Sequence, residues 1–258
     1  MNLGHASKCV LITGGSKGIG LACAQAFAAE GARIAICSRQ QENIDLALKS
    51  LPGALGVAAD CASPEAAQGM IERVEADLGP IDILVNSAGA AKRAQPKDLT
   101  PALWRAAMDA KYFSTINVVD PMIKRMAQRA SGVIVNIIGV GGKVASSAHL
   151  AGGAANAALM LATAGLGATY APSGVRVVGV SPSLTETDRV LEGLEVDAKA
   201  ANISIEVARA RSIEKMPLGR MATPEDIANI VLFVASDRAS YLTGTTISAD
   251  GGLNPTIL

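Results

Sequence analysis

Aromatic residues are scarce in this chain: they make up 3% of its 258 residues, whereas apolar residues make up 50%. The hydrophobic core must therefore consist mainly of Ala, Val, Ile and Leu. The 26 glycines allow neighbouring backbones to approach one another closely. This composition suits helices that pack tightly on a sheet.

An excess of either charge is also lacking, since Lys plus Arg and Asp plus Glu each number 23. No long-range field draws the protein toward nucleic acid or an anionic membrane, although a local basic pocket is compatible with these numbers. The N-terminal apolar run Cys9–Ile12 is too short for a signal peptide, and we expect no apolar run to span a bilayer. We therefore expect a cytoplasmic protein with no nucleic-acid or membrane partner.

Cysteine is rare as well, and all four cysteines fall in the first quarter of the chain, at Cys9, Cys23, Cys37 and Cys61. No pair of them has the CxxC spacing of a zinc ligand set or a redox motif. The hydrophobic pattern places most of them inside regular elements, which indicates buried, reduced thiols. We expect no metal site.

Short β-branched or apolar runs alternate with longer helical patterns along the chain. The expected strands are residues 9–13, 33–37, 56–59, 81–86, 132–138, 176–180 and 246–249. The expected helices are residues 19–29, 42–51, 64–78, 103–129, 154–170 and 224–236. Strands separated by helices require right-handed crossovers, which produce a parallel sheet covered on both faces. We expect a doubly wound α/β fold with one domain over residues 1–258.

Two segments depart from this alternation. Pro121 lies within the segment 103–129 and is expected to kink or divide it, because proline removes a helix hydrogen-bond donor. The region 183–218 is charged and Ala-rich, follows a strand end and has helical periodicity between loops. We expect it to form a helical flap over a site.

The sequence TGGSKGIG, residues 13–20, follows the first expected strand and opens the first expected helix. Glycines at such a turn let the backbone approach a pyrophosphate, whose charge the helix N-terminal N–H groups stabilise. A plain glycine-rich turn would have the same composition, but the strand–turn–helix context favours nucleotide binding. The expected phosphate loop comprises Gly14, Ser16, Lys17, Gly18, Ile19 and Gly20.

The second expected strand ends at Ser38 and Arg39, where a carboxylate would normally accept the ribose hydroxyls of NAD. Arg39 and Lys17 offer cations there instead. Both could be solvated surface charges, but their positions suit the 2′-phosphate of NADP. We therefore predict NADP as the cofactor.

These residues resemble the motifs of the short-chain dehydrogenase/reductase family, and the resemblance covers essentially the whole chain. NSAG at 86–89 is close to the family's NNAG, and PSLTET at 182–187 resembles its PGxxxT, with Ser183 replacing the glycine. The later sequences PLGR, PEDIA, TG and DGG match the family's C-terminal third. The resemblance implies a Rossmann-like domain that forms a homotetramer. It also adds to the expected cofactor site Ser38, Asp60, Cys61, Asn86, Ala88, Gly89, Pro182, Thr185 and Thr187.

Enzymes of that family move hydride between a nicotinamide and a carbonyl or alcohol, using Asn, Ser, Tyr and Lys. Alignment to the family pattern puts Lys111, Gly139, Gly152 and Asn156 at these four positions. Gly152 cannot donate a proton, and Asn156 cannot supply the cation that lowers the pKa of a tyrosine. The family's usual mechanism is therefore not available in its usual form.

Three functions remain open, and the first is an NADP(H)-dependent oxidoreductase whose proton donor has moved. His149 lies three residues before Gly152 and would share a helix face with it if the helix extends that far. Ser146 or Ser147 could orient a carbonyl, although serines there are more often helix caps. A lysine could stabilise the oxyanion: Lys111 is favoured, and Lys143 is expected to be a solvated loop charge. The candidate catalytic residues are His149, Lys111, Ser147 and Asn156.

The second open function is a catalytically silent NADP(H)-binding subunit with a regulatory or structural role. The third is a lyase or isomerase on the same fold, since a fold does not determine a function. We favour the oxidoreductase, acting on a small-molecule carbonyl or alcohol.

Overall fold

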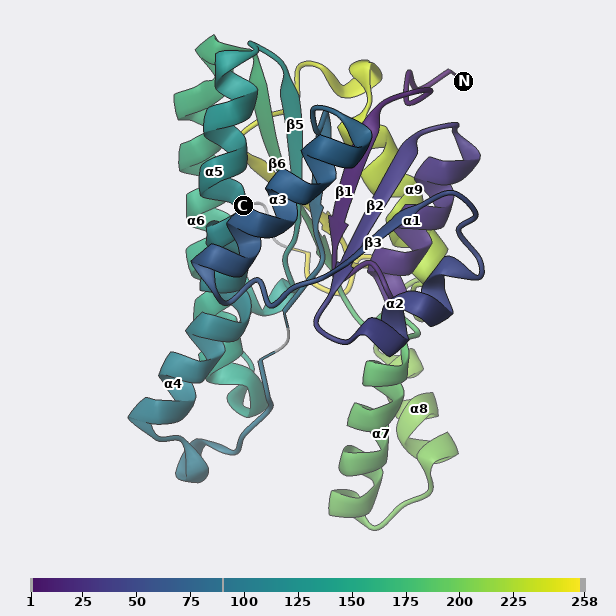
Figure 1. The fold of residues 1–258 in the computed structure, drawn as a ribbon. Helices are drawn as coiled ribbons and strands as arrows, with labels where there is room; N and C mark the ends of the chain where they lie inside the picture. Colours follow the sequence, from purple (N-terminus) through teal and green to yellow (C-terminus); the bar gives the residue numbers. More distant parts are fainter. Residues whose placement is uncertain (1, 90, 256–258) are drawn as a thin grey trace.

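The computed structural model describes residues 2–89 and 91–255. Its strands are β1 Cys9–Thr13, β2 Arg33–Ser38, β3 Leu55–Ala58, β4 Ile83–Asn86, β5 Gly132–Ile137, β6 Val175–Pro182 and β7 Thr245–Ala249. They form one parallel sheet in the order β3-β2-β1-β4-β5-β6-β7 (Figure 1). The predicted doubly wound, Rossmann-like α/β fold is confirmed. The strand order reverses at β1, so the chain diverges between the carboxyl ends of β1 and β4.

Helices cover both faces of this sheet. They are α1 Gly18–Ala29, α2 Gln41–Leu48, α3 Pro64–Leu78, α4 Pro101–Met108, α5 Ser114–Gln128, α6 Leu150–Tyr170, α7 Asp188–Ala201, α8 Ile205–Glu214 and α9 Pro224–Ala235. One face carries α1, α2 and α9, and the other carries α3, α5 and the end of α6. Helices α4, α7 and α8 project beyond the carboxyl edge of the strands (Figure 1).

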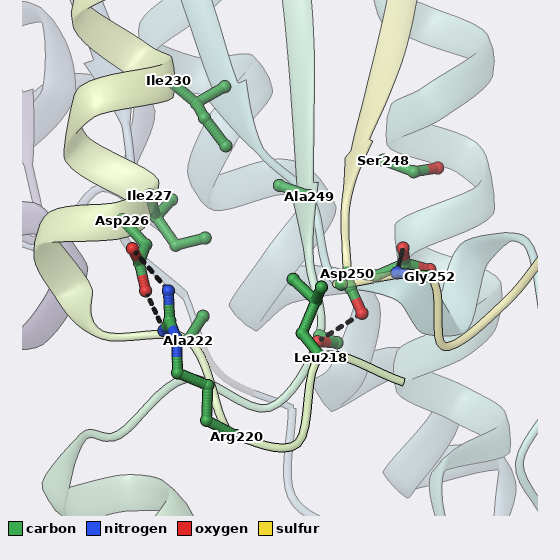
Figure 2. A pocket seen from close by; sticks show the side chains of 12 residues that line it. Leu218, Arg220, Ala222, Asp226, Ile227, Ile230, Ser248, Ala249, Asp250 and Gly252 are labelled. Carbon is green, nitrogen blue, oxygen red and sulfur yellow. Dashed lines mark hydrogen bonds and ion pairs between the residues drawn. The ribbon is translucent and has the colours of Figure 1, made fainter. Parts of the chain in front are cut away.

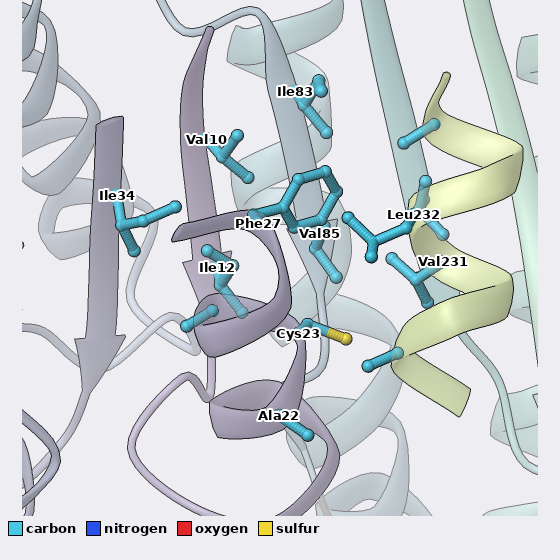
Figure 3. Packing of buried hydrophobic residues seen from close by; sticks show 14 of the residues in the cluster. Val10, Ile12, Ala22, Cys23, Phe27, Ile34, Ile83, Val85, Val231 and Leu232 are labelled. Carbon is cyan, nitrogen blue, oxygen red and sulfur yellow. The ribbon is translucent and has the colours of Figure 1, made fainter. Parts of the chain in front are cut away.

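Alternating side chains of the strands build the two apolar layers. In β1, Val10 and Ile12 belong to the layer beneath α1 and α9, whereas Leu11 belongs to the layer beneath α3 and α5. Among the residues described, Phe27 is the one aromatic side chain of the buried apolar set. Figure 3 shows its ring among Val10, Val85 and Leu232. The core is therefore aliphatic, as the composition predicts, and one ring fills its first layer.

A chain of buried polar side chains crosses the sheet at the carboxyl ends of its central strands. Thr13 of β1 donates to Asn86 of β4 at 3.4 Å, and the amide of Asn86 donates to Asn136 of β5 at 2.9 Å. Asn136 in turn donates to Thr163 of α6 at 3.0 Å, and the hydroxyl of Thr13 accepts from the backbone N–H of Ala88 at 3.3 Å. Each of these buried side chains has at least one hydrogen-bond partner, as burial requires. The polar chain ties three strands and α6 into one frame.

The division of the helix that was expected at Pro121 was wrong. Helix α5 runs through Pro121 without division, and the predicted helix 103–129 is interrupted earlier, by a π-helical turn at Asp109–Phe113. The hydroxyl of Ser114 donates to the carbonyl of Ala110 at 2.8 Å, and that of Thr115 donates to the carbonyl of Lys111 at 2.9 Å. These side-chain bonds satisfy carbonyls that the wider turn leaves without their usual helical partners.

The expectation that no apolar run could span a bilayer was also wrong. The segment Leu150–Ser173 is long enough and apolar enough to cross a membrane, as judged from its length and composition alone. It behaves as a core helix in this fold. Ala151, Ala155 and Leu159 are buried, and Thr163 ends the polar chain described above. The apolarity of α6 thus reflects its packing within the protein.

Truncation of the buried Phe27 ring tests this description of the core. Phe27→Ala should lower the free energy of unfolding by about 3–5 kcal/mol, because it removes buried area and leaves a cavity. Leu46→Ala, at a side chain that is 62% exposed, should cost less than about 1 kcal/mol. Denaturant unfolding of both variants measures these values, and equal losses would contradict the central place of Phe27.

Candidate functional site

In the glycine-rich turn after β1, backbone segments lie so close to one another that side chains would not fit at Gly14 or Gly20. A Cβ atom at Gly20 would lie 2.2 Å from the carbonyl oxygen of Gly14, and one at Gly14 would lie 2.8 Å from the backbone nitrogen of Ala88. Gly14 and Gly18 also have positive φ angles, of 66° and 51°. Lys17 stands at the N-cap of α1, and within the described residues its side chain makes no capping bond. The N–H groups that begin α1 are therefore available to an anion.

A cavity of about 490 Å³ opens beside this turn, at the carboxyl ends of β1 to β4. Predicted cofactor residues that line it are Gly14, Ser38, Arg39, Asp60, Cys61, Ala88 and Gly89. Its lining also includes residues that the sequence reasoning missed: Cys37, Ala59, Ala62, Ser87, Ala106, Asp109, Ala110 and Ser114. The last four come from α4, the π-helical turn after it and the first residue of α5. Gly89, in the segment after β4, indicates how closely the π-helical turn approaches that segment, since a Cβ atom there would lie 2.3 Å from the carbonyl oxygen of Ala110.

The remaining predicted cofactor residues do not belong to the lining of this cavity. Asn86 lies in the buried polar chain beneath it. Ser16, Lys17, Gly18, Ile19 and Gly20 form the turn and the start of α1. Pro182 ends β6 and Thr185 is buried beyond it. The methyl group of Thr187 lies 3.1 Å from a Cβ atom placed on Gly18. The segment after β6 and the glycine-rich turn are therefore neighbours.

Two exposed cations stand at this cavity. Arg39 lines it directly after β2, and Lys17 lies in the glycine-rich turn. In the described part of the chain neither side chain forms an ion pair. The carboxylate of Asp60 accepts a hydrogen bond from the backbone N–H of Ala62 at 3.0 Å, which fixes its orientation at the cavity wall.

His149 lies where a side chain of residue 152 would otherwise begin. The residue ends a 3₁₀ turn, Ser147–His149, and forms the N-cap of α6, so it does not belong to the helix as the shared-face argument required. Its ring nevertheless folds toward α6. A Cβ atom at Gly152 would lie 2.2 Å from Cε1 and 2.3 Å from Nε2 of the imidazole. Only glycine at 152 leaves room for this ring.

Asn156 lies in α6 one helical turn after Gly152 and is buried beside Gly139 and Gly141. Its Nδ2 atom lies 3.0 Å from a Cβ atom placed on Gly139 and 3.6 Å from one on Gly141. The Cδ2 atom of His149 lies 3.5 Å from that same point on Gly141, so both side chains converge on one turn of the backbone. The Oδ1 atom of Asn156 is buried and has no hydrogen-bond partner among the described residues. A buried amide oxygen of this kind is a candidate acceptor for a ligand.

The other candidate catalytic residues have different surroundings. Lys111 is half-buried in the π-helical turn, which packs against α6. Ser147 is exposed in the 3₁₀ turn. The interpretation of Ser146 and Ser147 as helix caps was wrong, because Ser146 makes no capping bond and His149 occupies the N-cap of α6.

Lys143 is not the solvated loop charge that the sequence suggested. Its ammonium group donates to the carbonyl of Thr246 at 3.3 Å and to the hydroxyl of Ser248 at 3.0 Å. These bonds anchor the turn after β5 to β7. Lys143 therefore has a structural partner away from His149.

The region 183–218 contains two helices, α7 and α8, as its periodicity predicts. Ser204 caps α8 by accepting from the N–H of Val207 at 3.3 Å, and Asn202 adopts a positive φ of 50° at the end of α7. Arg93, in the loop after β4, forms an ion pair with Asp197 of α7 at 3.4 Å. This contact links the helical region to the other side of the carboxyl edge.

A second cavity, of about 310 Å³, lies between the end of β7 and the start of α9 (Figure 2). Asp226 accepts from the backbone N–H of Thr223 at 2.8 Å and pairs with Arg220, which holds the pKa of Asp226 at about 2. Leu218, Ile227 and Ile230 supply much of the apolar lining. The PLGR, PEDIA and DGG motifs border this cavity, a role that the sequence reasoning did not assign to them.

Comparison with known proteins agrees with this geometry. The profile of a family described as enoyl-(acyl carrier protein) reductase matches residues 14–254. The chain is 35% identical over 246 residues to acetoacetyl-CoA reductase of Shinella zoogloeoides, which covers 95% of this chain and 98% of that protein. It is 30% identical over 258 residues to 3-oxoacyl-(acyl-carrier-protein) reductase of Chlamydia muridarum, which covers 98% of this chain and 100% of that protein.

Solved structures are similar over the same extent. L-sorbose reductase from Gluconobacter frateurii, complexed with NADPH and L-sorbose, superposes with a TM-score of 0.93 at 28% identity over 100% of both chains. A short-chain dehydrogenase/reductase family protein superposes with a TM-score of 0.82 at 34% identity, over 97% of this chain and 98% of that one. The chain therefore belongs to the short-chain dehydrogenase/reductase family, a family of NAD(P)H-dependent oxidoreductases that act on carbonyl substrates.

Proposed function

We propose that this protein is an NADP(H)-dependent oxidoreductase of a carbonyl or alcohol substrate, in which the imidazole of His149 exchanges the proton. The observation that carries the proposal is the position of that ring in the space left free by Gly152. On the family pattern, residue 152 is where the tyrosine stands. The histidine would therefore present its proton from the place where a tyrosine side chain would begin.

The cavity beside the glycine-rich turn has the features that NADPH requires. Gly14, Gly18 and Gly20 form a cradle that side chains would fill, and the uncapped start of α1 offers N–H groups to the pyrophosphate. Arg39 and Lys17 would contact the 2′-phosphate. When bound, the nicotinamide supplies or accepts the hydride. Similar solved proteins hold NADPH, among them L-sorbose reductase and a variant of actinorhodin polyketide ketoreductase.

The residues around His149 favour a rebuilt catalytic site over an emptied one. Gly152 makes room for the imidazole, and Gly139 makes room for the amide of Asn156. A site that had only lost its function would not need to fill both spaces with polar side chains, since burial of such groups is costly. In this proposal Asn156 orients a bound group through its buried Oδ1 atom, and Lys111 stabilises the developing oxyanion.

Reversal of the charge at Arg39 tests the choice of cofactor. Arg39→Asp should weaken NADPH binding roughly 10- to 100-fold, because it removes a charged hydrogen bond worth about 1.5–3 kcal/mol. NADH binding should change less than about twofold. Calorimetric titration measures both constants, and Lys49→Asp, at an exposed cation outside the cavity lining, should leave both unchanged. Equal losses for the two nucleotides would show that Arg39 does not recognise the phosphate.

Removal of the imidazole tests the proton donor. His149→Ala should lower kcat by about 10²-fold or more while the Kd for NADPH stays the same, since general acid catalysis contributes about 10²–10⁴. Gly152→Ala should lower kcat as well, because its Cβ atom displaces the ring. Rates are measured by NADPH oxidation with acetoacetyl-CoA and L-sorbose as first substrates, chosen from the similar proteins.

Val144→Ala, in the same loop as His149, should keep the full rate and serves as the control. A full rate in His149→Ala would refute the assignment. NADPH binding without turnover of any carbonyl substrate would instead favour a silent subunit.

We also propose that the protein is a homotetramer in the cytoplasm. The exposed residues of α6 are Ala154, Ala157, Leu161, Gly165, Ala168 and Thr169, with no charged side chain among them, and Leu161 is 76% exposed. Small apolar residues on an exposed helix are typical of an interface between copies. The four cysteines are free thiols, as in proteins of reducing compartments.

Placement of a charge on this face tests the assembly. Leu161→Glu should shift the particle measured by light scattering after gel filtration to a smaller oligomer, because an unpaired carboxylate would have to be buried. Leu46→Glu, on the exposed side of α2, should leave the assembly intact. A monomeric wild-type protein would contradict the proposal directly.

A further inference from the structure

Two cysteines that the proposed mechanism does not use lie in contact within the wall of the nucleotide cavity. The Sγ atoms of Cys37 and Cys61 are 3.9 Å apart, although the residues are separated by 24 positions. Both side chains are nearly fully buried, at 1% and 4% exposure, yet both line the cavity. Cys37 comes directly before Ser38 and Arg39, and Cys61 directly follows Asp60. The pair therefore lies between the segments assigned to the adenosine end of the cofactor.

The two sulfurs differ in character. The contact with Cys61, together with burial, raises the pKa of the Cys37 thiol well above its usual range, whereas the contact with Cys37 lowers the pKa of Cys61; either sulfur can be the donor. Burial raises the pKa of Cys9 to about 11 and that of Cys23 to about 12. Thiolates are the reactive form of cysteine. We therefore assign Cys61 as the attacking sulfur and Cys37, which is in contact with it, as its partner.

We propose that Cys37 and Cys61 form an oxidisable pair, joined to a disulfide by a peroxide, and that this disulfide weakens nucleotide binding. The thiolate of Cys61 attacks one peroxide oxygen and the O–O bond breaks, so that Cys61 becomes a sulfenic acid. The departing hydroxide takes up the proton that the Cys61 thiol had released and leaves as water. The sulfur of Cys37 then loses its proton and attacks the sulfur of Cys61, which releases the second water. Two thiols lose two electrons, and one hydrogen peroxide becomes two waters.

The consequence for the cavity follows from bond length. A disulfide holds its sulfurs about 2.05 Å apart, so the two atoms must approach by roughly 2 Å. The backbone around them is closely tied: Ala59 donates to the carbonyl of Ser38 at 3.0 Å, and Asn117 donates to the carbonyl of Cys61 at 3.0 Å. Movement of either cysteine therefore shifts the adjoining Ser38 or Asp60 at the cavity wall. This consequence rests on the proposed function of the cavity as a nucleotide site.

The test uses the full chain without added nucleotide. Hydrogen peroxide treatment should reduce the number of titratable thiols from four to two and yield a Cys37–Cys61 cross-linked peptide in non-reducing mass spectrometry. The oxidised protein should bind NADPH at least tenfold more weakly, and dithiothreitol should restore both thiols and affinity. NADPH added before peroxide should slow the cross-link, because ligand binding favours the reduced cavity.

For each variant, the NADPH affinity of the oxidised protein is compared with that of the same protein in the reduced state. Cys37→Ala should lose the effect of peroxide on NADPH affinity, whereas Cys23→Ala, whose cysteine lies in the opposite apolar layer, should keep it. Oxidation at Cys9 or Cys23 with Cys37 and Cys61 still free would overturn the proposal, as would a cross-link that leaves affinity unchanged. If the reduced protein binds neither NADPH nor NADH, the proposed function fails together with the effect on binding. The cross-linked peptide found by mass spectrometry shows whether Cys37 and Cys61 form the disulfide, whatever the outcome for nucleotide binding.

Discussion

The buried hydrogen-bond chain from Thr13 through Asn86 and Asn136 to Thr163 is the constraint on which the rest of the site depends. It joins β1, β4, β5 and α6 at one end of the sheet, where water cannot replace a lost partner. The glycine-rich turn begins at one end of this chain, and His149 begins the helix at its other end. The cavity thus lies beside one end of this chain, and the helix that follows His149 is bonded to the other end at Thr163.

Glycines in the phosphate turn and near His149 both leave space that a side chain would fill. At Gly14 and Gly20 the missing side chain lets backbones approach each other, which shapes the phosphate turn. At Gly152 and Gly139 it makes room for the side chains of His149 and Asn156. In the second case the space beside each glycine is occupied by a polar side chain from another position, and we propose that this replaces the family's usual catalytic groups. This pairing is the physical reason to interpret the site as altered rather than abandoned.

Sequence reasoning predicted the elements well where a periodic pattern is long or a cap is present. Strand Cys9–Thr13 and helix Pro64–Leu78 were predicted to the residue, and the latter begins at a serine cap and a proline. The cavity lining from Gly14, Arg39 and Asp60 followed from motifs at strand ends. The π-helical turn at Asp109–Phe113 could not be predicted, because it depends on side-chain bonds to carbonyls. The direction of the His149 ring and the contact of Cys37 with Cys61 depend on tertiary packing, which no spacing reveals.

The most direct test of the central claim is a calorimetric titration of the purified, reduced protein with NADPH and then with NADH at moderate salt. The account predicts saturable binding of NADPH that is at least about tenfold tighter than that of NADH. Binding of neither nucleotide would contradict it, because the cradle of Gly14, Gly18 and Gly20 and the cations Lys17 and Arg39 would then have no ligand. Equal binding of both would retain the nucleotide site and refute the recognition of the 2′-phosphate.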